Sequence, residues 1–217
     1  MNIRGILWDM DGVLVDTGDL HFQTWRSILG EHGIDLTYEL FRNTFGMRNA
    51  EILPIWFGRP LQDYEVNQIS AAKEARFRSA ARGRVRALPG VRLWLERFQN
   101  QGFRQAIASS APEENVEMIV DELGIRRYFQ ALVPAADLPG KPDPTVFVVA
   151  AGQIGLPPEQ CLVIEDSVAG IEAAGRAGMK CLAVTTTYPA AALGGAGLIV
   201  QDLDALSPHQ FRAWLDG

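Results

Sequence analysis

Six short apolar runs, most of them separated by helical segments, dominate the pattern of this sequence. The runs lie at 3–8, 103–109, 131–135, 161–165, 180–185 and 197–200. From the second run onward, segments of helical pattern separate them, at 112–123, 144–154 and 167–177. Near-continuous apolar strands that alternate with helices are typical of a parallel sheet covered by helices on both faces. The sequence therefore predicts an α/β fold built on a parallel sheet.

Residues 18–82 interrupt this alternation, because they contain no convincing strand. His21, Trp25, Ile28 and Leu29 recur at helical spacing, and further helices are expected at 37–44, 49–57 and 62–82. The stretches on either side contain the glycines and the proline that are common in connectors. We therefore expect a helical domain inserted into the sheet domain.

Composition and charge exclude several classes of protein. The 217-residue chain is 47% hydrophobic and 21% charged, which suits a globular protein with one substantial core. No apolar stretch approaches the roughly eighteen residues that a membrane span needs, and Asp9 interrupts the N-terminal run before it reaches the length of a signal sequence. A net charge of −6 argues against nucleic acid as a partner, since Lys and Arg must neutralise its phosphates. We expect a cytoplasmic monomer that binds a small molecule.

Acidic, hydroxyl and amine side chains follow four of the expected strands. Asp9 and Asp11 end the first strand, Ser109 and Ser110 the second and Glu165 and Asp166 the fourth, while Lys141 lies in the loop after the third. Ligands of open parallel sheets bind at the carboxyl ends of the strands. Each group alone has an ordinary explanation as a turn, a helix cap or a surface residue. Their convergence on one edge of one sheet predicts a functional site.

Four ordered segments of the chain resemble the motifs of a known superfamily. They read "DMDGVLVDT" (9–17), "IASSA" (107–111), "GKPDP" (140–144) and "VIEDSVAGIEAA" (163–174). The resemblance is to the haloacid dehalogenase (HAD) superfamily, in its branch of helical-capped phosphatases and β-phosphoglucomutases, and it covers nearly the whole chain. It implies a HAD-like, Rossmann-like core formed by residues 1–15 and 84–217, with a small helical-bundle cap domain at 16–83.

The residues at the strand ends suit phosphoryl transfer from a phosphate ester. Asp9 is the candidate nucleophile, because a carboxylate can form an aspartyl-phosphate once the charge on the phosphoryl oxygens is neutralised. Asp11 lies two residues further along an extended chain, about 6.6 Å away on the same face, where it would act as general acid and then general base. Lys141 would supply a positive charge. Ser109 would donate a hydrogen bond to the phosphate, with Ser110 beside it in the substrate site.

A metal ion is needed to complete this site, because two ionised aspartates would repel a phosphate dianion. Glu165 and Asp166 are hard oxygen ligands suited to Mg²⁺. A carboxylate oxygen of Asp9, the backbone carbonyl of Asp11 and water would complete its octahedral shell. The sequence therefore predicts Mg²⁺ dependence.

Asp11 and the residues around Lys141 argue against two other functions, dehalogenation and P-loop nucleotide binding. Dehalogenation produces no alkoxide that needs a proton, so Asp11 favours phosphoryl transfer. The "GKP" at 140–142 lacks the Ser or Thr that follows the lysine of a P-loop nucleotide-binding site.

Substrate choice would depend on the expected cap. His21 and Lys73 match the cap-associated histidine and lysine of β-phosphoglucomutases, and both types also occur in helical-capped phosphatases. The mutases carry arginine at the position of Asn49, whereas this chain has it one residue earlier, at Arg48. One residue turns a side chain by about 100° around a helix, so the arginine is expected to point elsewhere.

We therefore predict a phosphatase that acts on a small phosphorylated metabolite such as a sugar phosphate. After the second motif, the Ser and Lys of the mutase pattern are replaced by Ala111 and Pro112. A β-phosphoglucomutase-type mutase, in which a sugar-phosphate hydroxyl rather than water attacks the phosphoaspartate, is the alternative. A second alternative is a non-catalytic, ligand-sensing or partner-binding member, but the sequence retains Asp9 and the acidic pair that such a member would lose.

Overall fold

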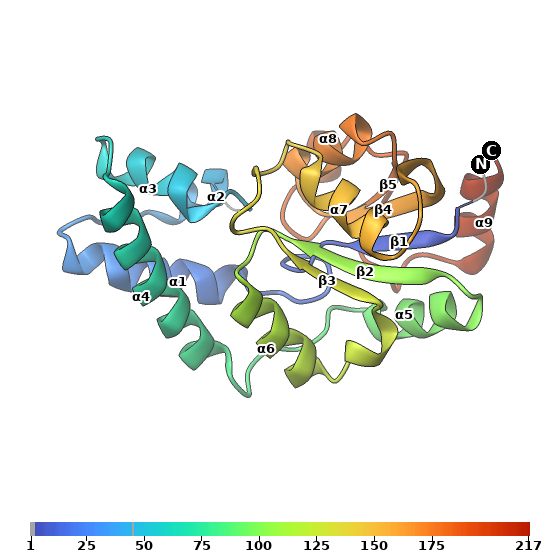
Figure 1. Cartoon of the computed structure of the whole chain (residues 1–217), viewed down its shortest axis with the longest axis horizontal. Coiled ribbons are helices and arrows are strands. Elements are labelled where there is room, and N and C mark those ends of the chain that lie inside the picture. Colours follow the sequence, from blue (N-terminus) through green and yellow to red (C-terminus); the bar gives the residue numbers. More distant parts are fainter. Residues whose placement is uncertain (1–2, 45) are drawn as a thin grey trace. The chain divides into compact units, whose positions relative to one another are not determined.

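The chain folds into two compact units, drawn in Figure 1 from a computed structural model that describes residues 3–44 and 46–217. One unit comprises Met1–Asp16 and Arg86–Gly217, and the other comprises Thr17–Val85. The first contains a β-sheet and is called the core unit below. The second is formed by helices and is called the helical unit.

Within the described residues, the core unit contains a six-stranded sheet in which all neighbouring strands are parallel. Its strands are β1 (Gly5–Trp8), β2 (Arg104–Ser109), β3 (Ala131–Pro134), β4 (Cys161–Glu165), β5 (Lys180–Val184) and β6 (Leu198–Val200). Their order is β3-β2-β1-β4-β5-β6, so the chain builds outward from β1 first on one side and then on the other. Sheets of this kind bind ligands where the direction changes, here between β1 and β4. The predicted α/β fold is confirmed, and each expected apolar run contains one strand.

Five α-helices lie between or after the described strands of the core unit along the chain. They are α5 (Val91–Asn100), α6 (Glu113–Leu123), α7 (Thr145–Gln153), α8 (Val168–Arg176) and α9 (Pro208–Asp216), with short 3₁₀ turns at Arg126–Tyr128, Pro158–Gln160 and Ala190–Ala192. At the start of α8, the Ser167 hydroxyl accepts the N–H of Gly170 at 3.0 Å. Such a cap satisfies a backbone donor that the first turn of a helix leaves open. It also makes α8 begin directly after the acidic pair at the end of β4.

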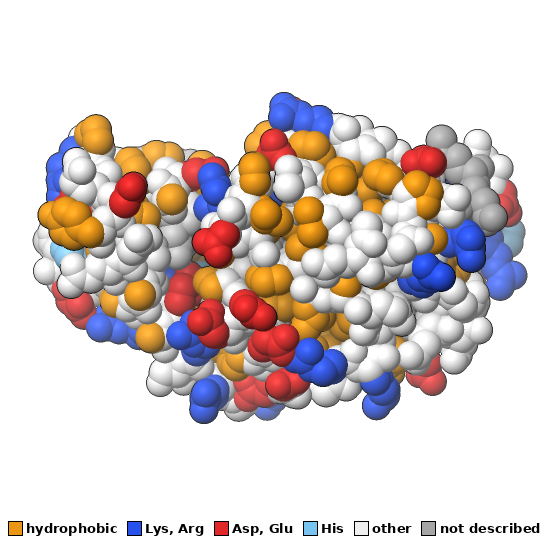
Figure 2. Space-filling view, viewed as in Figure 1, with side chains coloured by type: hydrophobic (Ala, Val, Ile, Leu, Met, Phe, Trp, Pro, Cys, Tyr) orange, Lys and Arg blue, Asp and Glu red, His pale blue; other side chains and the backbone are white. Residues whose placement is uncertain are grey.

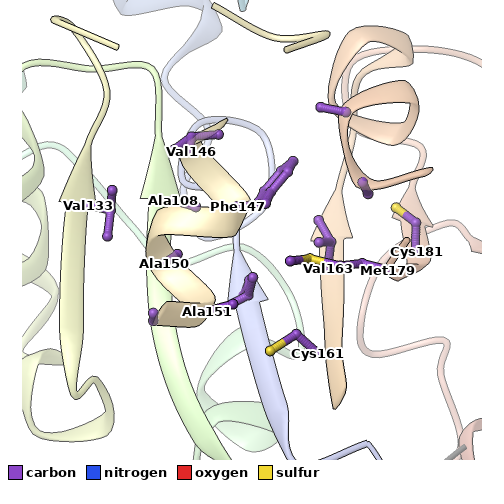
Figure 3. Close-up of a cluster of buried hydrophobic side chains, with 14 of the residues drawn as sticks. Ala108, Val133, Val146, Phe147, Ala150, Ala151, Cys161, Val163, Met179 and Cys181 are labelled. Carbon is purple, nitrogen blue, oxygen red and sulfur yellow. The ribbon is translucent and has the colours of Figure 1, made fainter. Parts of the chain in front are cut away.

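Apolar side chains cover both faces of the sheet. Leu7 of β1 belongs to a buried cluster that also contains Phe147 of α7 and Val163 of β4, shown in part in Figure 3. Trp8, the next residue of β1, meets Phe98 of α5 edge to face, with ring centroids 5.9 Å apart. Successive residues of a strand point to opposite faces. Burial on both faces explains why the strands are continuous apolar runs rather than alternating patterns.

The helical unit has an apolar core of its own. Its helices are α1 (Gly18–Glu31), α2 (Tyr38–Thr44), α3 (Asn49–Phe57) and α4 (Asp63–Ala81). Trp25 of α1 and Trp56 of α3 pack edge to face, with centroids 5.1 Å apart, and Leu29 and Leu53 are fully buried in the same cluster. Within the described residues, no helix has both the length and the apolar character needed to cross a membrane.

Acidic side chains gather over α6 on the surface drawn in Figure 2. The exposed residues of this helix include Glu113, Glu114, Asp121 and Glu122. Arg126 follows α6 and pairs with Asp121 at 3.0 Å, so one cation offsets part of this charge. The surface of α6 is therefore acidic on balance.

Candidate active site

The loop after β1 holds the two predicted catalytic aspartates. Asp9 follows β1 directly, and its backbone N–H donates to the carbonyl of Ile164 in β4 at 3.0 Å, so its position is set by the sheet. Its side chain is buried. Gly12 then adopts a positive φ of 87° and donates to the carbonyl of Val15 at 2.7 Å, which turns the chain sharply. Asp11, half-buried, lies at this turn.

Lys141 connects Asp9 to Glu165. Its Nζ lies 2.5 Å from Oδ1 of Asp9 and 2.6 Å from Oε1 of Glu165, and all three side chains are buried. Burial by itself would lower the pKa of Lys141, but the two facing carboxylates raise it above its usual range. Lys141 is therefore a fixed positive charge beside the candidate nucleophile.

Burial dominates the titration of Asp9 in the absence of a metal ion. Burial raises the pKa of Asp9 to about 7, opposed by the positive charge of Lys141 and reinforced by the negative charge of Glu165. Further positive charge close to Asp9 would therefore favour the ionised form of this nucleophile.

Glu165 is held at the start of α8 by four hydrogen bonds. Oε2 accepts the backbone N–H groups of Asp166 at 2.7 Å and Ser167 at 2.8 Å, together with the Ser167 hydroxyl at 2.9 Å, while Oε1 accepts from Lys141. Burial would raise the pKa of Glu165, but Lys141 and these donors outweigh it and lower the pKa. Both oxygens therefore already have donors. The structure supports a role in orienting Lys141, while the direct metal-ligand role stays a prediction.

The Asp166 carboxylate is packed between two loops. The hydroxyl of Thr187, in the loop after β5, donates to its Oδ2. A Cβ atom on Gly12 would overlap the same oxygen, so this carboxylate lies against the backbone of the β1 loop. Burial raises the pKa of Asp166 well above its usual range, and the charges of Glu165 and Asp9 raise it further.

Ser109 and Ser110 lie at the end of β2, the neighbour of β1 in the sheet. The Ser109 side chain is buried, and its Oγ accepts the backbone N–H of Ala111 at 3.1 Å. Since that oxygen acts as an acceptor toward Ala111, the hydroxyl hydrogen is not used in this contact. Ser110 is half-buried beside it. The geometry suits donation of a hydrogen bond to an anionic ligand.

The donor set of this cluster fits Mg²⁺. Asp9, Glu165 and Asp166 supply three buried carboxylates against the single charge of Lys141, an excess of negative charge that is costly to bury. In the part of the chain that the structure describes, no group of three or more His, Cys, Asp or Glu side chains is arranged to hold a metal ion. A hard cation here would therefore take ligands from backbone carbonyl, substrate or water oxygens besides carboxylates, as Mg²⁺ usually does.

The helical unit contains a polar cluster in which buried His21 and Lys73 and half-buried Asn49, three of the four predicted cap residues, lie close to Glu74. Lys73 Nζ lies 2.8 Å from His21 Nδ1 and 2.8 Å from Glu74 Oε1, and Asn49 Nδ2 donates to the same Glu74 oxygen at 2.8 Å. The His21 ring stacks on Phe77 with centroids 4.0 Å apart. Burial would raise the pKa of Glu74, but the charges of Lys73 and His21 hold it below its usual value.

Arg48, the fourth predicted cap residue, pairs with an acid at the start of α3. Its guanidinium lies 2.7 Å from Oε1 of Glu51, and its backbone N–H donates to Oε2 of Glu51 at 3.2 Å. Asn49, one residue later, contributes its side chain to the Lys73 and Glu74 cluster instead. The one-residue shift noted in the sequence therefore gives Arg48 and Asn49 different partners.

Comparison with known proteins identifies the family. The model of the family "Haloacid dehalogenase-like hydrolase" matches residues 6–184. The chain belongs to this family. The resemblance inferred from the four motifs is confirmed, and this HAD-like hydrolase is an enzyme.

Relatives of this HAD-like hydrolase include named phosphatases. It is 34% identical over 209 residues to the chloroplastic 5-amino-6-(5-phospho-D-ribitylamino)uracil phosphatase of Arabidopsis thaliana. The alignment covers 94% of this chain but only 55% of that longer protein. It is 31% identical over 180 residues to the phosphorylated carbohydrates phosphatase of Thermotoga maritima, with 82% of this chain and 83% of that protein covered. The crystal structure of β-phosphoglucomutase from Clostridium difficile superposes with a TM-score of 0.88 at 24% identity, covering 99% and 97% of the two chains. That likeness shows the fold.

Two residues of this HAD-like hydrolase were missed by the sequence reasoning. Thr187 follows β5, so inspecting the end of every strand, rather than the first four, would have found it. Glu74 gives no comparable signal, because neighbouring residues of a helix point about 100° apart and nothing in the pattern pairs it with Lys73.

Proposed function

We propose that this enzyme is a Mg²⁺-dependent phosphatase of small phosphorylated metabolites, which acts through an aspartyl-phosphate formed on Asp9. The observation that carries the proposal is the buried contact of Lys141 with both Asp9 and Glu165 at the carboxyl ends of β1 and β4. Lys141 binds one oxygen of the Asp9 carboxylate, which orients the other toward an incoming phosphorus atom. Such fixed orientation is what a weak nucleophile needs.

Asp9 and Asp11 divide the chemistry between them. Asp9 attacks phosphorus, and Asp11 donates a proton to the departing alkoxide. Asp11 then removes a proton from the water that attacks the aspartyl-phosphate, which regenerates both residues and releases inorganic phosphate. The tight turn at Gly12 supports these roles because it limits the positions that Asp11 can take relative to Asp9.

Ser109, Ser110 and Lys141 bind the phosphoryl group in this account. The Ser109 hydroxyl hydrogen, which does not serve Ala111, is donated to a phosphoryl oxygen. Ser110 contributes beside it, and the Lys141 ammonium offsets part of the charge on the phosphoryl oxygens.

Asp9, Asp166 and the backbone carbonyl of Asp11 would hold Mg²⁺, with Glu165 nearby. The ion, when bound, supplies the positive charge that the buried carboxylates and a phosphate dianion lack. The raised pKa of Asp9, caused first by burial, supports this requirement, because the nucleophile must be ionised to react.

A sugar or polyol monophosphate is the proposed substrate class. The named activities of the Arabidopsis and Thermotoga relatives concern a phosphorylated ribityl compound and phosphorylated carbohydrates. His21, Asn49, Lys73 and Arg48 of the helical unit are the candidates for selecting the leaving group. Their polar side chains suit hydroxyl groups.

A β-phosphoglucomutase activity is the second candidate, and the charges of the helical unit argue against it. A mutase must bind a second phosphate, which calls for cations without counter-ions. Arg48 pairs with Glu51 and Lys73 pairs with Glu74, so each of these cations has an acidic partner within the unit. The replacement of Ser and Lys by Ala111 and Pro112 points the same way.

The test is a phosphorus NMR time course with Mg²⁺. Fructose 1-phosphate, ribitol 5-phosphate and β-glucose 1-phosphate primed with its bisphosphate are supplied separately, and Asp9→Asn is the matched control. We expect inorganic phosphate from at least one substrate with the natural protein and none with Asp9→Asn. Conversion of glucose 1-phosphate to glucose 6-phosphate without phosphate release would replace the phosphatase by the mutase. Failure to turn over any phosphate ester would favour a non-catalytic member.

A further inference from the structure

The loop after β5 has no role in the proposed chemistry, but it contacts one of the three buried acids of the site, Asp166. β5 pairs with β4 so that Glu165 lies opposite Ala183, and the loop after β5 therefore starts beside the end of β4. Thr187 lies in this loop, and its hydroxyl donates to Oδ2 of Asp166. The contact joins residues that are 21 positions apart in the chain.

The backbone at Gly12 restricts the position of the Asp166 carboxylate from another side. A Cβ atom built on Gly12 would overlap Oδ2 of Asp166 and would lie 3.0 Å from the Thr187 hydroxyl oxygen. The carboxylate is thus held between the backbone of the β1 loop and the hydroxyl of the β5 loop. With two sides occupied, few orientations of the carboxylate remain.

The two acids after β4 are held in different ways. Glu165 accepts from two backbone N–H groups, the Ser167 hydroxyl and Lys141, so removing either side-chain donor leaves three of its four hydrogen bonds. Among the described residues, the Asp166 carboxylate accepts a single hydrogen bond, which comes from the Thr187 hydroxyl and goes to Oδ2. That arrangement leaves Oδ1 as the oxygen available to a ligand.

We infer that Thr187 is a positioning residue that fixes Asp166 for binding a divalent cation. This inference rests on the proposed function, because it assigns Asp166 to the cation site. Hydrogen-bond partners of metal ligands orient them and commonly change metal affinity by about 10- to 100-fold when removed. Thr187 would therefore set the concentration of Mg²⁺ at which the enzyme works, without touching substrate.

The test measures metal binding directly, without substrate. Mn²⁺ prefers the same oxygen ligands as Mg²⁺, and electron paramagnetic resonance reports the free ion during a titration. Thr187→Val removes the hydroxyl and keeps the shape, Thr187→Ser restores a hydroxyl, and Thr186→Val changes an exposed neighbour in the same loop. Thr187→Ala is a second deletion of the hydroxyl, for use if the valine variant unfolds.

We expect the Mn²⁺ dissociation constant to rise at least about tenfold in Thr187→Val and Thr187→Ala and to stay within about twofold of the natural value in Thr187→Ser and Thr186→Val. The Mg²⁺ concentration for half-maximal turnover should rise in parallel, with kcat at saturating Mg²⁺ changed much less. Natural affinity in both deletion variants, or weak binding in Thr187→Ser, would overturn the inference alone. Failure of the unsubstituted protein to bind Mn²⁺ would overturn the proposed metal site and the inference together.

Discussion

Substituting Gly170 by alanine should have two opposite effects on stability: a gain in helix propensity and a larger loss from displacing the Glu165 carboxylate. Gly170 lies in the first turn of α8, where a Cβ atom would overlap the Glu165 carboxylate. Gly175 lies later in the same helix, is exposed, and has no atom within 4 Å of a built Cβ. Replacing glycine by alanine within a helix normally stabilises it by about 0.5–1 kcal/mol. The two positions therefore form a matched pair.

The structure sets the size of the expected difference. At Gly170 the added methyl group must displace a carboxylate that accepts four hydrogen bonds, from Lys141, Asp166 N–H, Ser167 N–H and the Ser167 hydroxyl. Hydrogen bonds to a charged group contribute about 1.5–3 kcal/mol each, so losing two costs about 3–6 kcal/mol. After the gain in helix propensity, Gly170→Ala should destabilise the core unit by about 2–5 kcal/mol, whereas Gly175→Ala should stabilise it by about 0.5–1 kcal/mol.

Urea-induced unfolding, followed by circular dichroism, measures both variants, and phosphate release measures their activity. Gly170→Ala should also lose most of its turnover, because Lys141 loses the partner that orients it toward Asp9. Gly175→Ala should retain natural activity. A Gly170→Ala variant as stable and as active as Gly175→Ala would refute the reasoning that Glu165 must occupy this position.

Three further predictions concern the nucleophile, the metal and the polar cluster of the helical unit. Asp9→Asn should lower turnover by at least about three orders of magnitude and leave the fold intact, checked by phosphate release and circular dichroism; retained activity would contradict the nucleophile assignment. Exhaustive chelation should lower activity at least about 100-fold, and Mg²⁺ should restore it; full activity after chelation would exclude the metal. Glu74→Gln should destabilise the helical unit at pH 7, because Lys73 keeps its charge in a buried site and loses its counter-ion. The pKa of Glu74 is lowered in the folded state, so the folded protein binds fewer protons there than the unfolded chain. The free energy of unfolding of the natural protein should therefore exceed that of Glu74→Gln by less as pH falls below 4.5, the ordinary pKa of the group. A difference in stability that persists unchanged at lower pH would contradict the pairing with Lys73.

The fold was predictable because a parallel sheet buried on both faces leaves a simple trace in the sequence. The run at 161–165 coincides with β4, Cys161–Glu165, because its first four side chains are apolar and only the last, Glu165, is charged. The positions of Asp9 and Asp166 followed from the same reasoning, because polar residues after a buried strand must lie at its carboxyl end. The roles assigned to these residues remain proposals.

Contacts made through space were not predictable in the same way. The sequence reasoning assigned Lys141 a charge beside the nucleophile, but its bond to Glu165 depends on how the loop after β3 crosses toward β4. The contact of Thr187 with Asp166 depends on the path of the loop after β5, and Glu74 meets Lys73 through side-chain orientation rather than spacing. Hydrogen-bond partners of this kind carry no periodic signal, so only coordinates reveal them.

The most direct test of the account is to trap the aspartyl-phosphate. The enzyme is quenched in acid during turnover with Mg²⁺ and a substrate found in the NMR assay, reduced with borohydride, digested and examined by mass spectrometry. Borohydride reduces an acyl phosphate to an alcohol, so a phosphorylated Asp9 should be recovered as homoserine at position 9, and omission of substrate should abolish the product. Steady release of phosphate with unmodified Asp9 in every digest would contradict the central claim that this carboxylate is the nucleophile.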